Sequence, residues 1–161
     1  LHLYVKQLIK PHEGSLNAKL GETAKPFEAK TLNNQKIELA SVAKANKLVV
    51  INFFESWCGP CKSEMPDLQK LYSDFKNSGL DVIDVYNSSS AQAVTKLADE
   101  HSLKFLIVRD VDHSIFDLYG IDGVPTTVVI DRDLKILRSN SGMDIGLSAF
   151  ISEYFRKHVK K

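Results

Sequence analysis

The chain has 161 residues, of which 43% are hydrophobic and 25% charged, and its formal net charge is +1. This length and composition are typical of a single globular domain. The balanced charge gives no reason to expect a nucleic acid or an acidic membrane surface as a partner. No apolar run approaches the roughly 18–20 residues that a membrane-spanning helix requires.

The N-terminal part of the chain carries the weakest structural signal. Residues 1–20 are interpreted as an extension or linker, and residues 21–161 as the folded domain. Apolar residues within 4–9 have helical spacing, which indicates either a short helix packed on the domain or the end of a linker. Because the chain begins with Leu1 rather than Met, we expect an upstream segment, either a signal peptide or a membrane anchor.

The first predicted elements lead to a strongly apolar segment. Alternating residues predict a hairpin formed by 27–30 and 36–39. A short helix is expected over 39–45. The apolar run 48–54 then predicts a buried strand.

A long helix is predicted to begin near Pro60, with apolar residues on one face and Gly79 at its end. Pro66 lies inside this segment and is expected to kink the helix, because proline lacks a backbone donor. Next come a strand over 80–86, a helix after the capping residues 88–90, and a strand over 105–108. A helix is then expected after the capping residue Asp112, followed by a hairpin of 126–130 with 135–137 and a final helix over 147–159.

Strands and helices alternate along most of the chain, which is typical of an α/β domain with parallel strand pairs. The last hairpin adds an antiparallel strand. We therefore predict a mixed central sheet flanked by helices. No internal repeat or change of composition marks a second domain.

The most informative motif is Trp57-Cys58-Gly59-Pro60-Cys61, which contains both cysteines of the chain. It lies between the end of the buried strand and the start of the long helix, so the backbone N–H groups and the dipole of the helix favour a thiolate there. Cysteines three residues apart in a first helical turn can form a disulfide. The pair is therefore interpreted as a redox-active dithiol.

Two other interpretations of the cysteine pair stay open at this stage. A structural zinc site normally needs four ligands, and the five histidines are scattered, so we predict no metal site. A purely structural disulfide is possible, but so short a loop stabilises the fold little. The absence of a further cysteine is compatible with an oxidising compartment.

Three features in the right order resemble the thioredoxin-like family. They are the motif Trp57–Cys61 after a core strand, Pro66 at the position of the family's helix-kinking proline, and Gly123–Thr127 before a strand, which resembles the family's cis-proline loop. The resemblance implies a three-layer thioredoxin-like fold. It also implies that the Val124–Pro125 bond is cis, the alternative being an ordinary trans turn.

Within this family the chain resembles the extracytoplasmic TlpA/ResA-like branch over about residues 20–160. The N-terminal hairpin, an extra strand–helix segment around 80–108 and the run Lys62–Pro66 carry this resemblance. Asn52 stands where the simplest thioredoxins have a buried acid, so no proton-handling role is assigned to it. Glu64 matches a glutamate of the branch and is the expected substitute.

The resemblance assigns roles to the site residues. Cys58 is expected to be the nucleophile and Cys61 the resolving cysteine, while Glu64 handles the proton of Cys61. An ordinary solvated glutamate is the alternative for Glu64. The expected substrate-binding residues are Trp57, Gly59, Pro60, Val124 and Pro125, with Trp57 as a wall of the site rather than a core-filling aromatic.

The expected function is a thiol-disulfide oxidoreductase that reduces protein disulfides outside the cytoplasm, in the periplasm or anchored to a membrane. The resemblance implies a membrane-bound electron donor and a place in cytochrome c maturation, and no cofactor beyond the Cys58–Cys61 disulfide. Two alternatives remain: a metal-binding or metal-delivery module, with a ligand such as His113, and a peroxidase of related fold.

Overall fold

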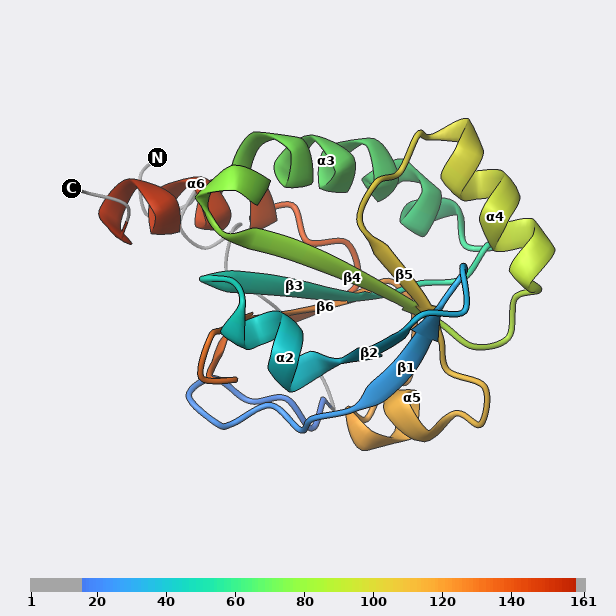
Figure 1. The fold of residues 1–161 in the computed structure, drawn as a ribbon, viewed down its shortest axis with the longest axis horizontal. Helices are drawn as coiled ribbons and strands as arrows, with labels where there is room; N and C mark the ends of the chain where they lie inside the picture. The colour runs from blue at the N-terminus through green and yellow to red at the C-terminus, as the bar shows by residue number, and fades with distance from the viewer. Residues whose placement is uncertain (1–15, 159–161) are drawn as a thin grey trace.

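The computed structural model describes residues 16–158, so the helix predicted within 4–9 and the last residue of the predicted final helix, Val159, lie outside the described residues. A seven-stranded sheet forms the middle layer, and helices cover both of its faces (Figure 1). The prediction of a mixed sheet flanked by helices is therefore confirmed. None of the helices within residues 16–158 is both long and apolar enough to cross a bilayer.

The strand order is β2-β1-β5-β4-β3-β6-β7. The central strands β3, β4 and β5 are parallel, and the other neighbouring pairs are antiparallel. The strand bounds are Glu28–Thr31 for β1, Lys36–Glu38 for β2, Leu48–Phe53 for β3, Leu80–Tyr86 for β4, Leu106–Arg109 for β5, Thr126–Asp131 for β6 and Ile136–Ser141 for β7.

Two hydrophobic cores lie on opposite faces of the sheet. Residues of α3, α4 and α6 form the first core, and residues of α2, α5 and the segment before β1 form the second. The helix bounds are Leu39–Lys44 for α2, Gly59–Phe75 for α3, Ala91–Glu100 for α4, Ser114–Leu118 for α5 and Leu147–His158 for α6, with a 3-10 turn over Lys76–Ser78.

The described residues before β1 pack against the domain. Leu16 and Ala18 are buried, and the N–H of Asn17 donates to the carbonyl oxygen of Tyr119 at 3.1 Å. Thr23 forms an isolated bridge with Lys135. The proposed boundary between extension and domain at residue 20 stays a prediction.

Strand β3 occupies the centre of the sheet, and all six of its residues are buried. Its apolar side chains enter both cores, which explains the continuous hydrophobic run in the sequence. β3 ends at Phe53, and α3 begins six residues later at Gly59. The helix continues through Pro66, and the turn after it ends at Gly79, whose φ of 110° favours glycine.

Strand β7 is longer than predicted, because its polar residues are buried. Only 135–137 was expected, but the strand runs over Ile136–Ser141. Arg138, Ser139 and Asn140 lie outside the predicted strand, yet all three are buried in the structure. Polar residues at buried positions hide a strand from a prediction based on apolar alternation.

The capping predictions need two corrections. Ser90 alone caps α4, where its hydroxyl accepts from the N–H of Ala93 at 3.1 Å, whereas Ser88 and Ser89 bind elsewhere. In α5 the N-cap position is occupied by His113, and the exposed Asp112 before it accepts from the N–H of Ser114 at 3.2 Å.

The first turn of α5 depends instead on the buried carboxylate of Asp110. It accepts from the N–H groups of Ile115 at 3.1 Å and Phe116 at 2.8 Å. Asp110 lies four positions before the first residue of α5, whereas an ordinary N-cap residue directly precedes the helix. The sequence pattern of a cap therefore does not reveal its role.

Replacing Asp110 with Ala should lower the free energy of unfolding by about 1–3 kcal/mol, because two buried N–H donors lose their acceptor. Urea denaturation measures this loss. The matched control Asp112→Ala, on the exposed side of the same helix start, should cost clearly less. Equal losses in the two variants would contradict the assignment of Asp110 as the main cap.

Candidate redox site

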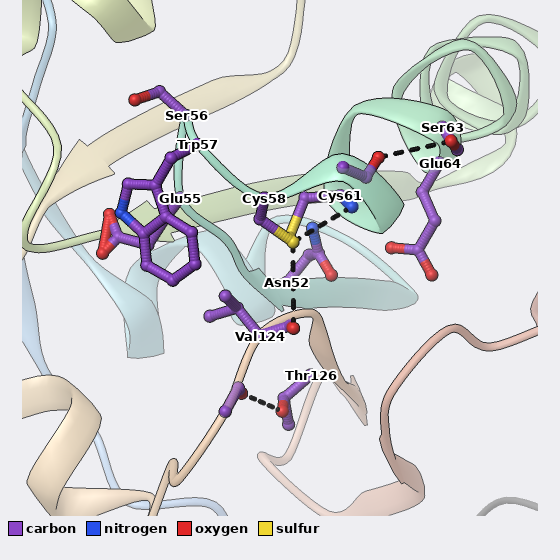
Figure 2. The surroundings of a disulfide bond; sticks show 12 residues. Asn52, Glu55, Ser56, Trp57, Cys58, Cys61, Ser63, Glu64, Val124 and Thr126 are labelled. Atoms are coloured by element: carbon purple, nitrogen blue, oxygen red, sulfur yellow. Dashed lines mark hydrogen bonds between the residues drawn. A yellow bond between two sulfur atoms is a disulfide. The ribbon is translucent and has the colours of Figure 1, made fainter.

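The two cysteines lie at the junction between β3 and α3, at the carboxyl edge of the parallel strands. Cys58 and Cys61 are joined as a disulfide, with their Cα atoms 5.2 Å apart (Figure 2). Only 5% of the surface of Cys58 and 1% of that of Cys61 is exposed. The structure therefore brings together the two sulfur atoms expected from the sequence, and it leaves Cys58 as the more accessible one.

The sulfur of Cys58 is placed at the N-terminus of a long helix. Cys58 is the N-cap of α3, and the backbone N–H of Cys61 donates to its Sγ atom at 3.2 Å. An N–H group and a helix dipole that point at sulfur stabilise the thiolate after reduction. This geometry supports Cys58 as the nucleophile.

A second loop faces the disulfide from across the site. The Val124–Pro125 peptide bond is cis, and the carbonyl oxygen of Val124 lies 3.8 Å from Sγ of Cys58. The hydroxyl of Thr126 donates to the carbonyl oxygen of Gly123 at 2.8 Å and holds this loop in shape (Figure 2).

The surface on both sides of the disulfide is open. Gly59 and Pro60 are exposed on α3, and Gly123 is exposed on the facing loop. A Cβ atom added at Gly59 or Gly123 would meet no atom within 4 Å. An extended polypeptide can therefore approach the backbone beside Cys58 without obstruction.

Trp57 lies on the surface beside the disulfide. Its side chain is 67% exposed, and its Nε1 atom donates to the hydroxyl of Ser88 at 3.3 Å. The alternative of a core-filling aromatic therefore does not fit the structure. An exposed indole held at one edge offers an apolar face to a partner molecule.

Glu64 is half-buried and turned toward the loop after β7. Its Oε1 atom accepts from the N–H of Asp144 at 3.1 Å, and Asp144 is itself held by a buried ion pair with Arg138 at 2.7 Å. The pKa of Glu64 is raised to about 7, chiefly by burial; the Asp144 N–H lowers it, and the charges of Asp144 and Asp67 raise it. Glu64 is thus not an ordinary solvated glutamate.

Glu55 is a buried carboxylate that the sequence reasoning missed. It is 2% exposed, and its two oxygens accept from the backbone N–H groups of Asn87, Ser88 and Ser89 and from the hydroxyls of both serines at 2.6–3.3 Å. The hydroxyl of Ser89 also accepts from the N–H of Ser56 at 2.8 Å. We call this group the Glu55–serine cluster; it ties the cysteine loop to the loop before α4.

A sequence signal for this cluster exists. An acidic residue stands directly after the most apolar run, and a run of three serines, Ser88–Ser90, stands after the next strand. The carboxyl ends of neighbouring parallel strands meet at one edge of a sheet, so these two segments were bound to be close.

The metal-binding alternative gains no support from the geometry. Within the part of the chain that the structure describes, no group of three or more His, Cys, Asp or Glu residues is arranged to hold a metal ion. His113, the ligand considered from the sequence, contacts Nδ2 of Asn87 through its Nδ1 atom at 2.9 Å.

Replacing Glu64 with Gln should lower the pKa of the Cys61 thiol in the reduced protein, because the ionised carboxylate no longer opposes the thiolate. Disulfide exchange should slow by about tenfold through the loss of a proton acceptor. Since the pKa of Glu64 is about 7, the difference in thiol titration should appear above pH 7 and vanish below it.

Alkylation of the reduced protein as a function of pH measures both effects. The exposed Asp74, near the other end of α3, supplies the matched control Asp74→Asn. An unchanged thiol titration in Glu64→Gln would exclude the proton-handling role.

Replacing Glu55 with Gln should reduce the free energy of unfolding by about 2–3 kcal/mol, because several buried donors lose a charged acceptor. Trp57 fluorescence should change as well, since Ser88 binds both side chains. Thermal and urea unfolding measure the loss, with the exposed Glu100→Gln as control. Wild-type stability in Glu55→Gln would show that the cluster does not hold the loops together.

Comparison with known proteins agrees with the geometry. The AhpC/TSA family model matches residues 20–139. The thiol-disulfide oxidoreductase ResA of Halalkalibacterium halodurans is 33% identical over 143 residues, which cover 89% of this chain and 78% of that protein. The corresponding ResA of Bacillus subtilis is 31% identical over 122 residues, 76% of this chain and 67% of that protein.

Solved structures share the fold. A putative protein disulfide isomerase from Bacteroides thetaiotaomicron superposes with a TM-score of 0.80 at 22% identity, covering 92% of this chain and 96% of the other. A secreted disulfide oxidoreductase of Mycobacterium tuberculosis gives a TM-score of 0.67 at 21% identity, covering 79% and 95%. The predicted thioredoxin-like fold is thus confirmed, and the chain belongs to the AhpC/TSA family, among the relatives of the ResA thiol-disulfide oxidoreductases.

Proposed function

We propose that this thiol-disulfide oxidoreductase reduces the disulfides of other proteins outside the cytoplasm. A membrane-bound electron donor then reduces its Cys58–Cys61 disulfide again. The observation that carries the proposal is the position of the Cys58 sulfur. It receives the N–H of Cys61 at the start of α3, and it lies 3.8 Å from the carbonyl oxygen of Val124, with the open positions Gly59 and Gly123 on either side. Such a sulfur is both activated and reachable by an extended substrate.

The reaction follows from this arrangement. In the reduced protein the thiolate of Cys58 attacks one sulfur of the substrate disulfide, and the other substrate sulfur leaves as a thiolate that takes up a proton. The thiol of Cys61 then loses its proton and attacks the sulfur of Cys58. The mixed disulfide breaks, the second substrate thiolate departs and is protonated, and two electrons have passed from the protein to the substrate.

The site residues divide the remaining work. In this scheme the backbone of Val124, whose carbonyl oxygen lies 3.8 Å from the Cys58 sulfur, pairs with the substrate chain, and Trp57 offers an exposed apolar face beside it. Pro125 and Gly59-Pro60 shape the two sides of the approach. Glu64 is the proton acceptor for Cys61 in this scheme, because its raised pKa allows it to bind and release a proton near neutral pH.

The reducing direction and the location rest on the resemblance to ResA-type proteins. The residues between the cysteines, Gly59-Pro60, are those of reducing members of the thioredoxin-like family. An extracytoplasmic site is supported by the shared fold with a secreted oxidoreductase and by cysteine usage, since both cysteines are in one disulfide. We expect the substrates to include the cysteine pairs that must be reduced for cytochrome c maturation.

The Cys61→Ser variant should trap substrate proteins as mixed disulfides at Cys58, because the second attack cannot occur. Cys58→Ser, which keeps the buried Cys61, is the control and should trap none. Separation of the adducts on non-reducing gels and mass spectrometry identify the trapped partners. Failure of Cys61→Ser to trap protein thiols, or equal trapping by the control, would refute the assignment of Cys58 as nucleophile.

The reduction potential of the pair, measured against glutathione, decides the direction. A value near that of thioredoxin, about −270 mV, is expected for a reductant, whereas a value near about −120 mV belongs to a strong oxidant. Rapid consumption of hydrogen peroxide by the reduced protein would instead favour a peroxidase.

A further inference from the structure

A second acid lies under the redox site, on the strand next to β3. Asp84 is fully buried in β4, at 0% exposure. Its neighbours on the same face of the strand, Val82 and Tyr86, belong to the hydrophobic core that contains Cys58 and Cys61. The carboxyl group of Asp84 therefore points into the layer between the sheet and α3.

The carboxyl group of Asp84 is left without a close hydrogen bond. Within residues 16–158 neither oxygen has a partner of ordinary hydrogen-bond geometry, although the side chain of Asn52 lies near enough to lower the pKa of Asp84. Buried polar groups are nearly always hydrogen-bonded, and an exception in a core calls for an explanation, a redox or catalytic role among them. An ionised carboxylate in that position would be strongly disfavoured.

The register of the sheet places Asp84 in a row of polar side chains. It pairs with Asn52 on β3, Asn52 pairs with Thr127 on β6, and Thr127 pairs with Asn140 on β7. The hydroxyl of Thr127 donates to Oδ1 of Asn52 at 3.2 Å. Figure 2 shows Asn52 beneath the disulfide, so this polar row crosses the sheet under the two cysteines.

The titratable groups that face Asp84 come from α3. They are Glu64 and the cysteines, whereas β3 and β5 place Asn52 and Ile107 beside it. The pKa of Asp84 is raised to about 8, chiefly by burial; the side chain of Asn52 lowers it and the charge of Glu64 raises it. Both carboxyl groups thus titrate close to neutral pH.

The two acids behave as a coupled pair. Glu64, with a pKa of about 7, ionises first, and its charge then delays the ionisation of Asp84. At a pH between these two pKa values the two carboxyl groups together hold about one proton. In this form the pair can accept a second proton from a nearby thiol and can later give that proton back.

We propose that Asp84 and Glu64 together form the proton store of the redox cysteines, with Asp84 as its buried member and Glu64 as the member in contact with solvent. Asp84 acts through Glu64 and Cys61, so its role is to hold and position the proton rather than to touch the reacting sulfur. The inference rests on the dithiol cycle proposed above, and it holds for either direction of electron flow.

The proton balance of this step is closed. When Cys61 attacks the mixed disulfide, its thiol proton goes to the one-proton carboxyl pair, and its sulfur forms the bond to Cys58. The departing substrate thiolate takes one proton from the pair, or it takes one from solvent while the pair releases its extra proton to solvent; either route restores the one-proton pair. When a donor opens the Cys58–Cys61 disulfide, the pair gives its proton to the Cys61 thiolate and takes another from solvent.

The test on the unmodified protein is a carbon-13 NMR titration of the aspartate carboxyl groups in the oxidised and reduced states. The pKa of Asp84 should differ between the two states, because groups that share protons with a redox pair must respond to its charge. In Glu64→Gln the pKa of Asp84 should fall, since the opposing charge is absent. An Asp84 titration that ignores both changes would overturn the proposal.

The functional test compares Asp84→Asn with Asp81→Asn. Asp81 lies on the same strand, on the opposite face and at the far end from the cysteines, and burial raises its pKa too. Asp84→Asn should slow the attack of Cys61 by about tenfold or more at pH 7 and flatten its pH dependence. Asp81→Asn should leave the wild-type rate and profile.

The stability of the same variants controls for folding. The pKa of Asp84 is raised from 3.8 to about 8, so the wild-type protein should lose stability as the pH rises through this interval, and Asp84→Asn should lose less. If Cys61→Ser still traps partners but Asp84→Asn exchanges like Asp81→Asn, the proton store is wrong and the proposed function stands. If Cys61→Ser traps no partner, the proposed function is refuted, and the proton store, which rests on it, is refuted with it.

Discussion

The whole site depends on one contact, the donation of the Cys61 N–H to the sulfur of Cys58 at the start of α3. This contact exists because the buried strand β3 ends at the edge of the sheet and the helix begins with Cys58 as its cap. A sulfur in that position can carry negative charge without a cation nearby. The exposed glycines and the Val124 backbone matter only because they leave that sulfur within reach.

In the reaction we propose, burial of acids around this contact gives the site its proton chemistry. Sulfur exchange requires one thiol to lose a proton at each turnover, and an ordinary carboxyl group has too low a pKa to hold that proton near pH 7. Taking Glu64 partly out of water, and Asp84 entirely, brings their pKa values into the range of a thiol. The cost is a core that contains a polar row instead of apolar side chains.

Much of this could be predicted from the sequence, because the strand, the helix and the cysteines are contiguous. Glu64 came from the family resemblance, but the buried acids Glu55 and Asp84 were missed. Glu55 lies 32–34 positions from the N–H donors that it binds, and Asp84 lies 32 positions from Asn52, beside which the parallel register of β3 and β4 places it. Arg138 and Asn140 were hidden in the same way, since polar residues buried in β7 follow no apolar alternation.

The Glu55–serine cluster has a consequence for how partners are chosen. If the loop before α4 moved away from the cysteine loop, the Glu55 carboxylate would lose the N–H and hydroxyl donors of Ser88 and Ser89 at once. Independent movement of either loop is therefore unfavourable. The indole at position 57 is anchored to that same pair of loops. The two loops around the sulfur of Cys58 are therefore held in one shape, so we expect partner proteins to fit this shape rather than to change it.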